Sequence, residues 1–155
     1  MTTTVATFAL ADPDHSPQAR RLAYAGLAPF GLGTLLIWLI GDRNLDAHAW
    51  ASLALSAYAG LTVAFLGGIY WGLGFMQQQS APPHFAWGCV PVFVGWLGVV
   101  MPAYAGLVVH GVMLIVCYAV DRRFYPALGA KAWLNLRFRL SAASAFLCFL
   151  AAAGC

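Results

Sequence analysis

The stretch AFLGGIYWGLGF, residues Ala64–Phe75, lies inside an apolar run that extends over residues 50–76. As an α-helix this run would be about 40 Å long, because each residue adds about 1.5 Å to a helix. The hydrocarbon core of a bilayer is only about 30 Å thick. We therefore expect a membrane-spanning helix that tilts, bends or protrudes from the core. The stretch also contains four glycines, although glycine is a poor helix former.

The composition of the whole chain indicates that lipid is its solvent. Of the 155 residues, 62% are hydrophobic and only 8% are charged. A soluble domain of this size carries a charge on about a quarter of its residues. So little polar surface cannot cover a globule in water. We therefore expect one integral membrane domain that contacts the lipid bilayer and has no nucleic-acid partner.

Five apolar runs are long enough, or nearly long enough, to span a bilayer as helices. The third and fourth runs form a hairpin at Pro102, because proline disfavours a continuing helix. Residues 1–19 lack the basic start and long apolar core of a signal peptide, and we expect them to form a mobile tail. We therefore predict an all-α bundle over residues 20–155, with spans at about 22–40, 50–76, 85–101, 103–120 and 136–153.

The basic residues are distributed unevenly between the two ends of the predicted bundle. With the N-terminus inside, seven of the eight Lys and Arg residues fall on the inner side, and Arg43 falls outside. Because cytoplasmic loops carry an excess of positive charge, this distribution predicts five spans, with the N-terminus inside and the C-terminus outside. The inner basic residues are Arg20, Arg21, Arg122, Arg123, Lys131, Arg137 and Arg139.

Asp121 follows the fourth run and stands directly beside two of these arginines. We expect it to form a local salt bridge with Arg122 or Arg123 at the level of the headgroups. The inner basic residues together predict a positively charged surface, which favours contact with anionic lipid headgroups. Docking of an acidic partner on this surface is the alternative.

Small residues recur at every fourth position along the second run. On a helix this spacing forms one groove, and close approach of backbones through such grooves is a common means of helix association in lipid. We interpret the groove first as a packing face for the first or third helix or for a second copy of the chain. A bare-backbone site for a flat ligand, such as a quinone or a lipid head, and a flexible hinge are the alternatives. The groove consists of Gly60, Ala64, Gly68 and Gly72.

Aromatic residues and one histidine are the other candidates for a site within the membrane. Trp71 and Trp87 fall at matching depth on consecutive predicted helices. Both suit the aromatic belt at the membrane interface, as does Tyr70. Alternatively, Tyr70 and Trp71 wall a pocket with Trp87, in which the two indoles stack on a ring. His110 lies inside a predicted span, where an ionisable group is costly. We expect either a neutral imidazole bonded to a backbone carbonyl or a tyrosine, or a proton-relay or ligand-contacting role.

No constellation typical of catalysis or metal binding is visible in the sequence. We find no paired carboxylates, no Ser/His/Asp set and no phosphate-binding loop. The four cysteines show neither a CxxC nor a Cys/His spacing. The sequence therefore favours a non-enzymatic protein without a metal or a cofactor.

Three elements in order carry a resemblance to a known family: FLGGIYWGLGF at Phe65–Phe75, Asp121 after the fourth run, and YPALGAKAWLNLRFRLS at Tyr125–Ser141. With the proline-centred third run, they make residues 20–153 similar to the domain-of-unknown-function 3429 family, the transmembrane protein 69-like proteins. The resemblance implies a small multi-span protein of a bacterial or mitochondrial inner membrane, and we expect the bacterial one here. It implies no reaction.

These observations lead to two functional expectations. The first is an accessory or assembly protein that packs against the helices of other membrane proteins or of itself, because the loops are short and small-residue grooves are present. The second is a binder or carrier of an apolar ligand, a quinone or a lipid. Its predicted pocket is lined by Gly67, Gly68, Trp71, Trp87 and His110.

Overall fold

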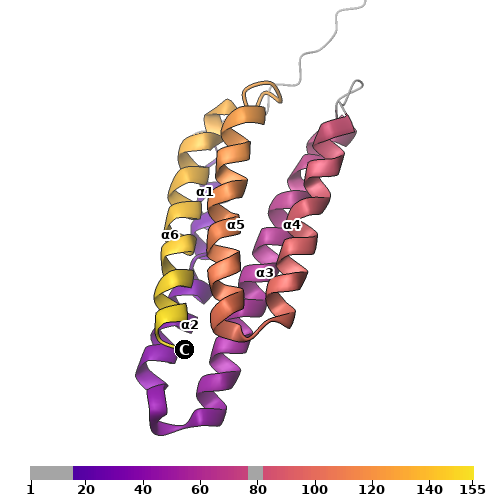
Figure 1. Ribbon diagram of the computed structural model, residues 1–155. Helices are drawn as coiled ribbons and strands as arrows, with labels where there is room; N and C mark the ends of the chain where they lie inside the picture. Colours follow the sequence, from indigo (N-terminus) through magenta and orange to yellow (C-terminus); the bar gives the residue numbers. More distant parts are fainter. Residues whose placement is uncertain (1–15, 77–81) are drawn as a thin grey trace, which may run out of the picture.

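A computed structural model describes residues 16–76 and 82–155, most of which are helical (Figure 1). No β-strand occurs in those two ranges. The predicted tail, 1–19, lies mostly outside the described residues, and the first helix already begins at Pro17. The elements are α1 (Pro17–Ala25), α2 (Ala28–Ile40), the 3₁₀ turn η2 (Gly41–Arg43), α3 (Leu45–Met76), α4 (Pro82–Val100), α5 (Ala103–Phe124), the 3₁₀ turn η3 (Lys131–Trp133) and α6 (Leu134–Ala153).

The predicted all-helical architecture is confirmed for the described residues. Helix α3 begins earlier than the predicted second run, while α4, α5 and α6 match the later runs closely. By length and composition, four stretches of the described chain could cross a membrane, and His84–Val100 is a shorter apolar helix. The four stretches are Pro17–Arg43, Leu45–Met76, Ala103–Phe124 and Lys131–Ala153.

The first predicted span, 22–40, is not one continuous helix. A turn at Gly26 separates α1 from α2. Pro29 explains this break, because its ring has no N–H and would clash with the carbonyl of Ala25 one turn earlier. Proline is tolerated in the first turn of a helix, which is its place in α2. The hydroxyl of Tyr58 donates a hydrogen bond to the Gly26 carbonyl at 3.0 Å and so stabilises the turn.

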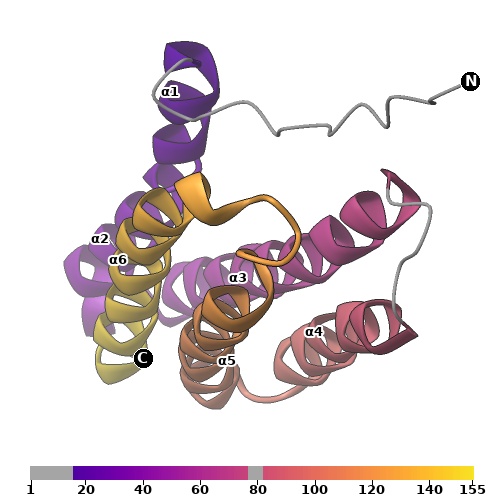
Figure 2. The same ribbon diagram turned by 90° about the horizontal axis from the view of Figure 1, so that it is seen from above.

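Helix α3 is the centre of the bundle. It packs against α2, α4 and α5, while α6 packs against α5 and α2. Figure 2 shows α3 running obliquely, with α2 and α6 near one end and α4 near the other. Large apolar side chains remain on the outside of the bundle. Leu61, Phe65, Phe93 and Trp96 are 64% to 70% exposed, a surface compatible with lipid surroundings.

Glycines allow α3 and α4 to approach each other closely. A Cβ atom placed on Gly95 would lie 2.7 Å from the carbonyl oxygen of Gly60. A Cβ atom placed on Gly88 would lie 2.9 Å from the carbonyl oxygen of Gly67. Backbone atoms cannot rotate out of the way as side chains can. Only residues without a Cβ therefore permit this helix contact.

Of the predicted groove with four-residue spacing, Gly60 lies in the contact face between α3 and α4, but Gly68 and Gly72 do not. A Cβ atom on Gly68 or Gly72 would meet no atom within 4 Å, both residues are exposed, and Ala64 is half-buried. The physical reason is the helix period: each four-residue step rotates about 40° around the axis, whereas seven residues come back close to the starting face. The contact glycines recur every seven residues, at Gly60, Gly67 and Gly74.

Candidate functional site

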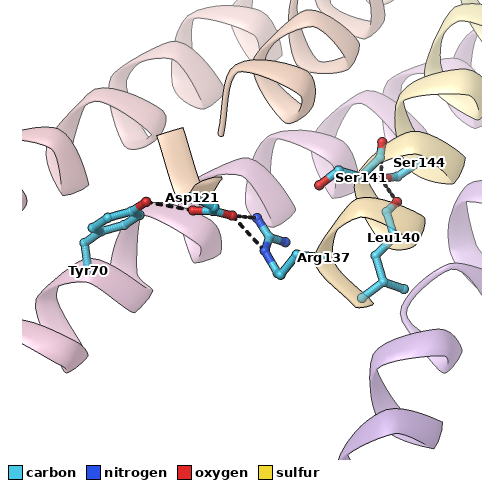
Figure 3. Close-up of polar contacts among 6 residues, drawn as sticks. All are labelled: Tyr70, Asp121, Arg137, Leu140, Ser141 and Ser144. Atoms are coloured by element: carbon cyan, nitrogen blue, oxygen red, sulfur yellow. Dashed lines mark hydrogen bonds and ion pairs between the residues drawn. The ribbon is translucent and has the colours of Figure 1, made fainter. Parts of the chain in front are cut away.

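A buried ion pair joins α5 to α6 at the end of the bundle where α6 begins. Asp121, in the last turn of α5, accepts hydrogen bonds on one oxygen from Nε and Nη2 of Arg137, at 2.9 and 2.6 Å. Its other oxygen accepts a hydrogen bond from the hydroxyl of Tyr70 at 2.7 Å (Figure 3). Because Tyr70 belongs to α3, one carboxylate connects three helices.

The surroundings of this ion pair exclude solvent. Asp121 and Tyr70 are each 1% exposed, and the Arg137 side chain is 11% exposed. Tyr125, just after α5, is also buried; its burial, together with the nearby Asp121 carboxylate, raises the pKa of its hydroxyl to about 12. Tyr125 is therefore neutral at physiological pH. One negative and one positive charge balance each other inside the protein.

The predicted salt bridge between Asp121 and its neighbours Arg122 and Arg123 is wrong. Successive residues on a helix point about 100° apart, so a carboxylate that faces the bundle leaves the next two side chains outside. Arg137, which the sequence assigned to the basic surface, supplies the partner instead. The other predicted inner basic residues, Arg20, Arg21, Arg122, Arg123, Lys131 and Arg139, are all exposed.

An apolar pocket of about 610 Å³ lies between α1, α2, α3 and α6. Figure 2 shows α1 projecting away from the other helices, which leaves parts of α3 and α6 without a covering helix. The pocket is thus a consequence of the break at Gly26. Its walls are mostly large apolar side chains, among them Leu22, Phe30, Phe65, Ile69 and Leu140.

The hydroxyl groups on the α3 wall of the pocket are already engaged with the backbone. Tyr58 donates to the Gly26 carbonyl, as described above. Thr62 donates to the carbonyl of Tyr58 at 2.9 Å. Neither hydroxyl hydrogen is left for a bound molecule, so this wall is effectively apolar.

Helix α6 provides the polar wall of the pocket. Arg137, Ser141 and Ser144 all line it, and the i, i+4, i+7 spacing places them on one face of the helix. Ser144 donates its hydroxyl to the carbonyl of Leu140 at 2.6 Å (Figure 3). Ser141 is only 3% exposed, and its Oγ has no hydrogen-bond partner among the described residues. One buried hydroxyl at this wall of the pocket therefore has no partner among the described residues.

His110 is fully buried among α3, α4 and α5, outside this pocket. Its Nε2 lies 3.1 Å from the carbonyl oxygen of Gly95, and its ring fits against Gly98, where a Cβ atom would collide with it. Because a carbonyl can only accept, Nε2 carries a hydrogen. Nδ1 has no partner among the described residues. This geometry is that of a neutral imidazole bonded to the backbone, one of the two alternatives raised by the sequence.

The ring-binding pocket predicted from Gly67, Gly68, Trp71, Trp87 and His110 is not assembled. The backbone of α4 covers Gly67, and the Trp71 indole lies on the same backbone. Trp87 packs into the core, whereas Gly68 faces outward. None of the five residues lines the apolar pocket, so a binding site within this chain involves other side chains.

The site that the structure offers combines an apolar volume, one free hydroxyl and a charge-balanced guanidinium. Across residues 16–76 and 82–155, no three His, Cys, Asp or Glu side chains lie close enough to hold a metal ion. Sequence reasoning missed Ser141 and Ser144 as site residues, and it did not anticipate that Tyr70 donates to Asp121. The available signal was the spacing of Arg137, Ser141 and Ser144 on one face of an otherwise apolar helix.

The described helices define an all-helical protein with segments long and apolar enough to cross a membrane. The chain belongs to the DUF3429 family of proteins of unknown function, whose sequence profile matches residues 15–153. This match confirms the family resemblance of the sequence over nearly the whole chain. Searches of curated proteins and of solved structures found no match.

Proposed function

We propose that this protein is a multi-pass membrane protein that takes up an amphiphile, of the lipid or quinone class, between its helices. The observation that carries this proposal is the apolar pocket between α1, α2, α3 and α6. Its volume of about 610 Å³ falls in the usual range for small-molecule sites. The protein acts by binding rather than by catalysis.

The proposed topology has five spans, with the N-terminus inside and the C-terminus outside. Helix α4 is the third of these five spans, since its length of about 28 Å is close to the thickness of the hydrocarbon core. The basic residues cluster at the end of the bundle opposite Arg43, which supports a cytoplasmic location for that end in a bacterial inner membrane. They would contact anionic lipid headgroups there. A reporter fused after Cys155 that is active only in the cytoplasm would contradict this topology.

The position of the pocket suits a ligand that arrives from the bilayer. It lies on the side of the bundle where α1 projects outward (Figure 2). The Phe65 side chain on its wall is 69% exposed, so apolar surface continues from the pocket to the outside. An acyl or isoprenoid chain could therefore enter sideways without crossing polar surface.

Filling the pocket is expected to remove the bound amphiphile. Ala23 lines the pocket from α1, and Ala23→Trp would place an indole in the volume that the ligand needs. We expect this variant to lose most of the lipophilic molecule that co-purifies with the wild-type protein. The measurement is gentle extraction from native membranes followed by mass spectrometry of small lipophilic molecules.

Ala25→Trp is the matched control for the pocket-filling variant. Ala25 is exposed on the same helix and does not line the pocket. The Ala25→Trp variant should therefore retain the co-purifying molecule at the wild-type level. Both variants should elute as folded protein in size-exclusion chromatography. Equal retention in the two variants, or no lipophilic molecule above the detergent background in the wild type, would rule out the proposed function.

An accessory role in membrane protein assembly is the second candidate. It is favoured by the outward-facing Gly68 and Gly72, where an added Cβ atom would meet no atom of the described residues within 4 Å, which leaves room on α3 for another helix. The same extraction tests it when proteins are also analysed. Gly68→Leu should then release a partner or a second copy, whereas Gly31→Leu, on an equally open position of α2, should not. Unchanged association of the Gly68 variant would exclude this use of the strip.

A further inference from the structure

Resting on the proposed binding function, we infer that the ligand carries an uncharged head with hydrogen-bond-accepting carbonyl oxygens, and that this head docks on Ser141 and Arg137. Two kinds of membrane molecule share this chemistry, quinones and acylglycerol esters. A phosphate-bearing head does not suit the same position. The unpartnered hydroxyl of Ser141 and the charge balance at Arg137 favour such a head.

The Ser141 hydroxyl needs an acceptor. A serine within a helix commonly donates to the carbonyl one turn earlier, as Ser144 does to Leu140 at 2.6 Å. Ser141 makes no such bond, although it is 3% exposed and lines the pocket. A buried polar group without a partner is destabilising. A carbonyl oxygen of a bound ligand would satisfy it.

Arg137 lies one turn before Ser141 and lines the same pocket. Two of its N–H groups are committed to one oxygen of Asp121. A guanidinium has five N–H donors, so donors remain for a second acceptor. Since both residues line the pocket one helical turn apart, we infer that one carbonyl oxygen receives hydrogen bonds from both of them.

The charge balance decides which acceptor fits. The Asp121 carboxylate, 1% exposed, already neutralises Arg137 at 2.6 Å. A phosphate at this place would have to compete with that carboxylate and would leave an uncompensated negative charge inside the protein, which is costly. A neutral carbonyl adds hydrogen bonds without adding charge. We therefore assign the polar wall of the pocket to a neutral head.

Three probes test the assignment on the full-length protein in dodecyl maltoside micelles, whose detergent has no carbonyl group. They are a short-chain ubiquinone, dioleoylglycerol, and dioleoyl phosphatidic acid with the same acyl chains as the glyceride. Native mass spectrometry measures the dissociation constants, and Ala23→Trp identifies binding in the pocket. We expect ubiquinone or dioleoylglycerol to bind at least tenfold more tightly than phosphatidic acid, and the tighter of the two identifies the source of the carbonyl.

Ser141→Ala should raise the dissociation constant of the tighter-binding neutral probe roughly three- to tenfold, as expected for the loss of one neutral hydrogen bond. Ser56→Ala is the matched control, because Ser56 is also buried with an unpartnered Oγ but lies outside the pocket. It should leave the affinity unchanged. Both variants should melt at the wild-type temperature or above it, since neither removes a hydrogen bond within the described protein.

The outcomes separate the inference from the proposed function. If phosphatidic acid binds in the pocket as tightly as the neutral probes, the assignment of a neutral head is wrong while the binding function stands. If Ser141→Ala binds like Ser56→Ala, Ser141 is not the donor and the inference falls. If no probe shows binding that Ala23→Trp removes, the proposed function itself fails.

Discussion

Replacing Gly67 by alanine is expected to lower the free energy of unfolding by about 2–3 kcal/mol, the upper range for overpacking in a well-packed contact. The added Cβ would collide with the carbonyl oxygen of Gly88 and lie 3.2 Å from Cβ of Pro91. Because the nearest obstacle is backbone, α4 would have to move away from α3 along its length. Titration of the purified protein in mixed micelles with sodium dodecyl sulfate, followed by circular dichroism, measures the loss.

Gly68→Ala provides the control at the adjacent position. A Cβ atom added at Gly68 would meet no atom within 4 Å, so the substitution disturbs no contact. Alanine has the higher helix propensity, and we expect the stability to be unchanged or to rise by about 0.5–1 kcal/mol. Equal effects of the two substitutions would show that the seven-residue glycine contact does not hold α3 and α4 together.

The second large effect is expected at the buried ion pair. Asp121→Asn leaves the Arg137 guanidinium inside the protein without its countercharge, although the shape of the side chain is retained. Removing one partner of a buried pair typically costs about 3–5 kcal/mol. We therefore expect the variant to melt far below the wild type or to express poorly. The same denaturant titration or a thermal melt in micelles measures this loss.

Two further variants make the result specific to the ion pair. Asp42→Asn changes an exposed carboxylate on η2 and should alter the stability by no more than about 0.5 kcal/mol. Asp121→Asn combined with Arg137→Met removes both charges and should recover a large part of the loss. If Asp121→Asn proves as mild as Asp42→Asn, the ion pair does not stabilise the junction of α3, α5 and α6.

The helices could be predicted from the sequence because their signal is local. Runs of apolar residues and the proline at the α4–α5 turn fix where α4, α5 and α6 lie to within about a turn. The break at Gly26 was not predicted, although Pro29 provided the signal for it. The face of α3 was also misassigned. Small residues occur at both four- and seven-residue spacing, and only the position of α4 decides which set is used.

The site was harder to predict because its partners are distant in the sequence. Asp121 is followed by two arginines yet pairs with Arg137, and its second partner, Tyr70, belongs to another helix. Such pairings depend on how α3, α5 and α6 rotate about their axes, which no local pattern specifies. The pocket likewise results from the outward direction of α1 and therefore could not be predicted from any single segment.

We propose that the pocket between α1, α2, α3 and α6 holds the chain of a membrane amphiphile. Photolabelling tests this binding, with a quinone and a diacylglycerol that each carry a diazirine in the chain, followed by peptide mapping. We expect at least one probe to label the pocket walls at Phe65 and Leu140, and we expect Ala23→Trp to suppress this labelling. Labelling of the outward-facing Phe93 and Trp96 at the same level, unaffected by Ala23→Trp, would contradict it.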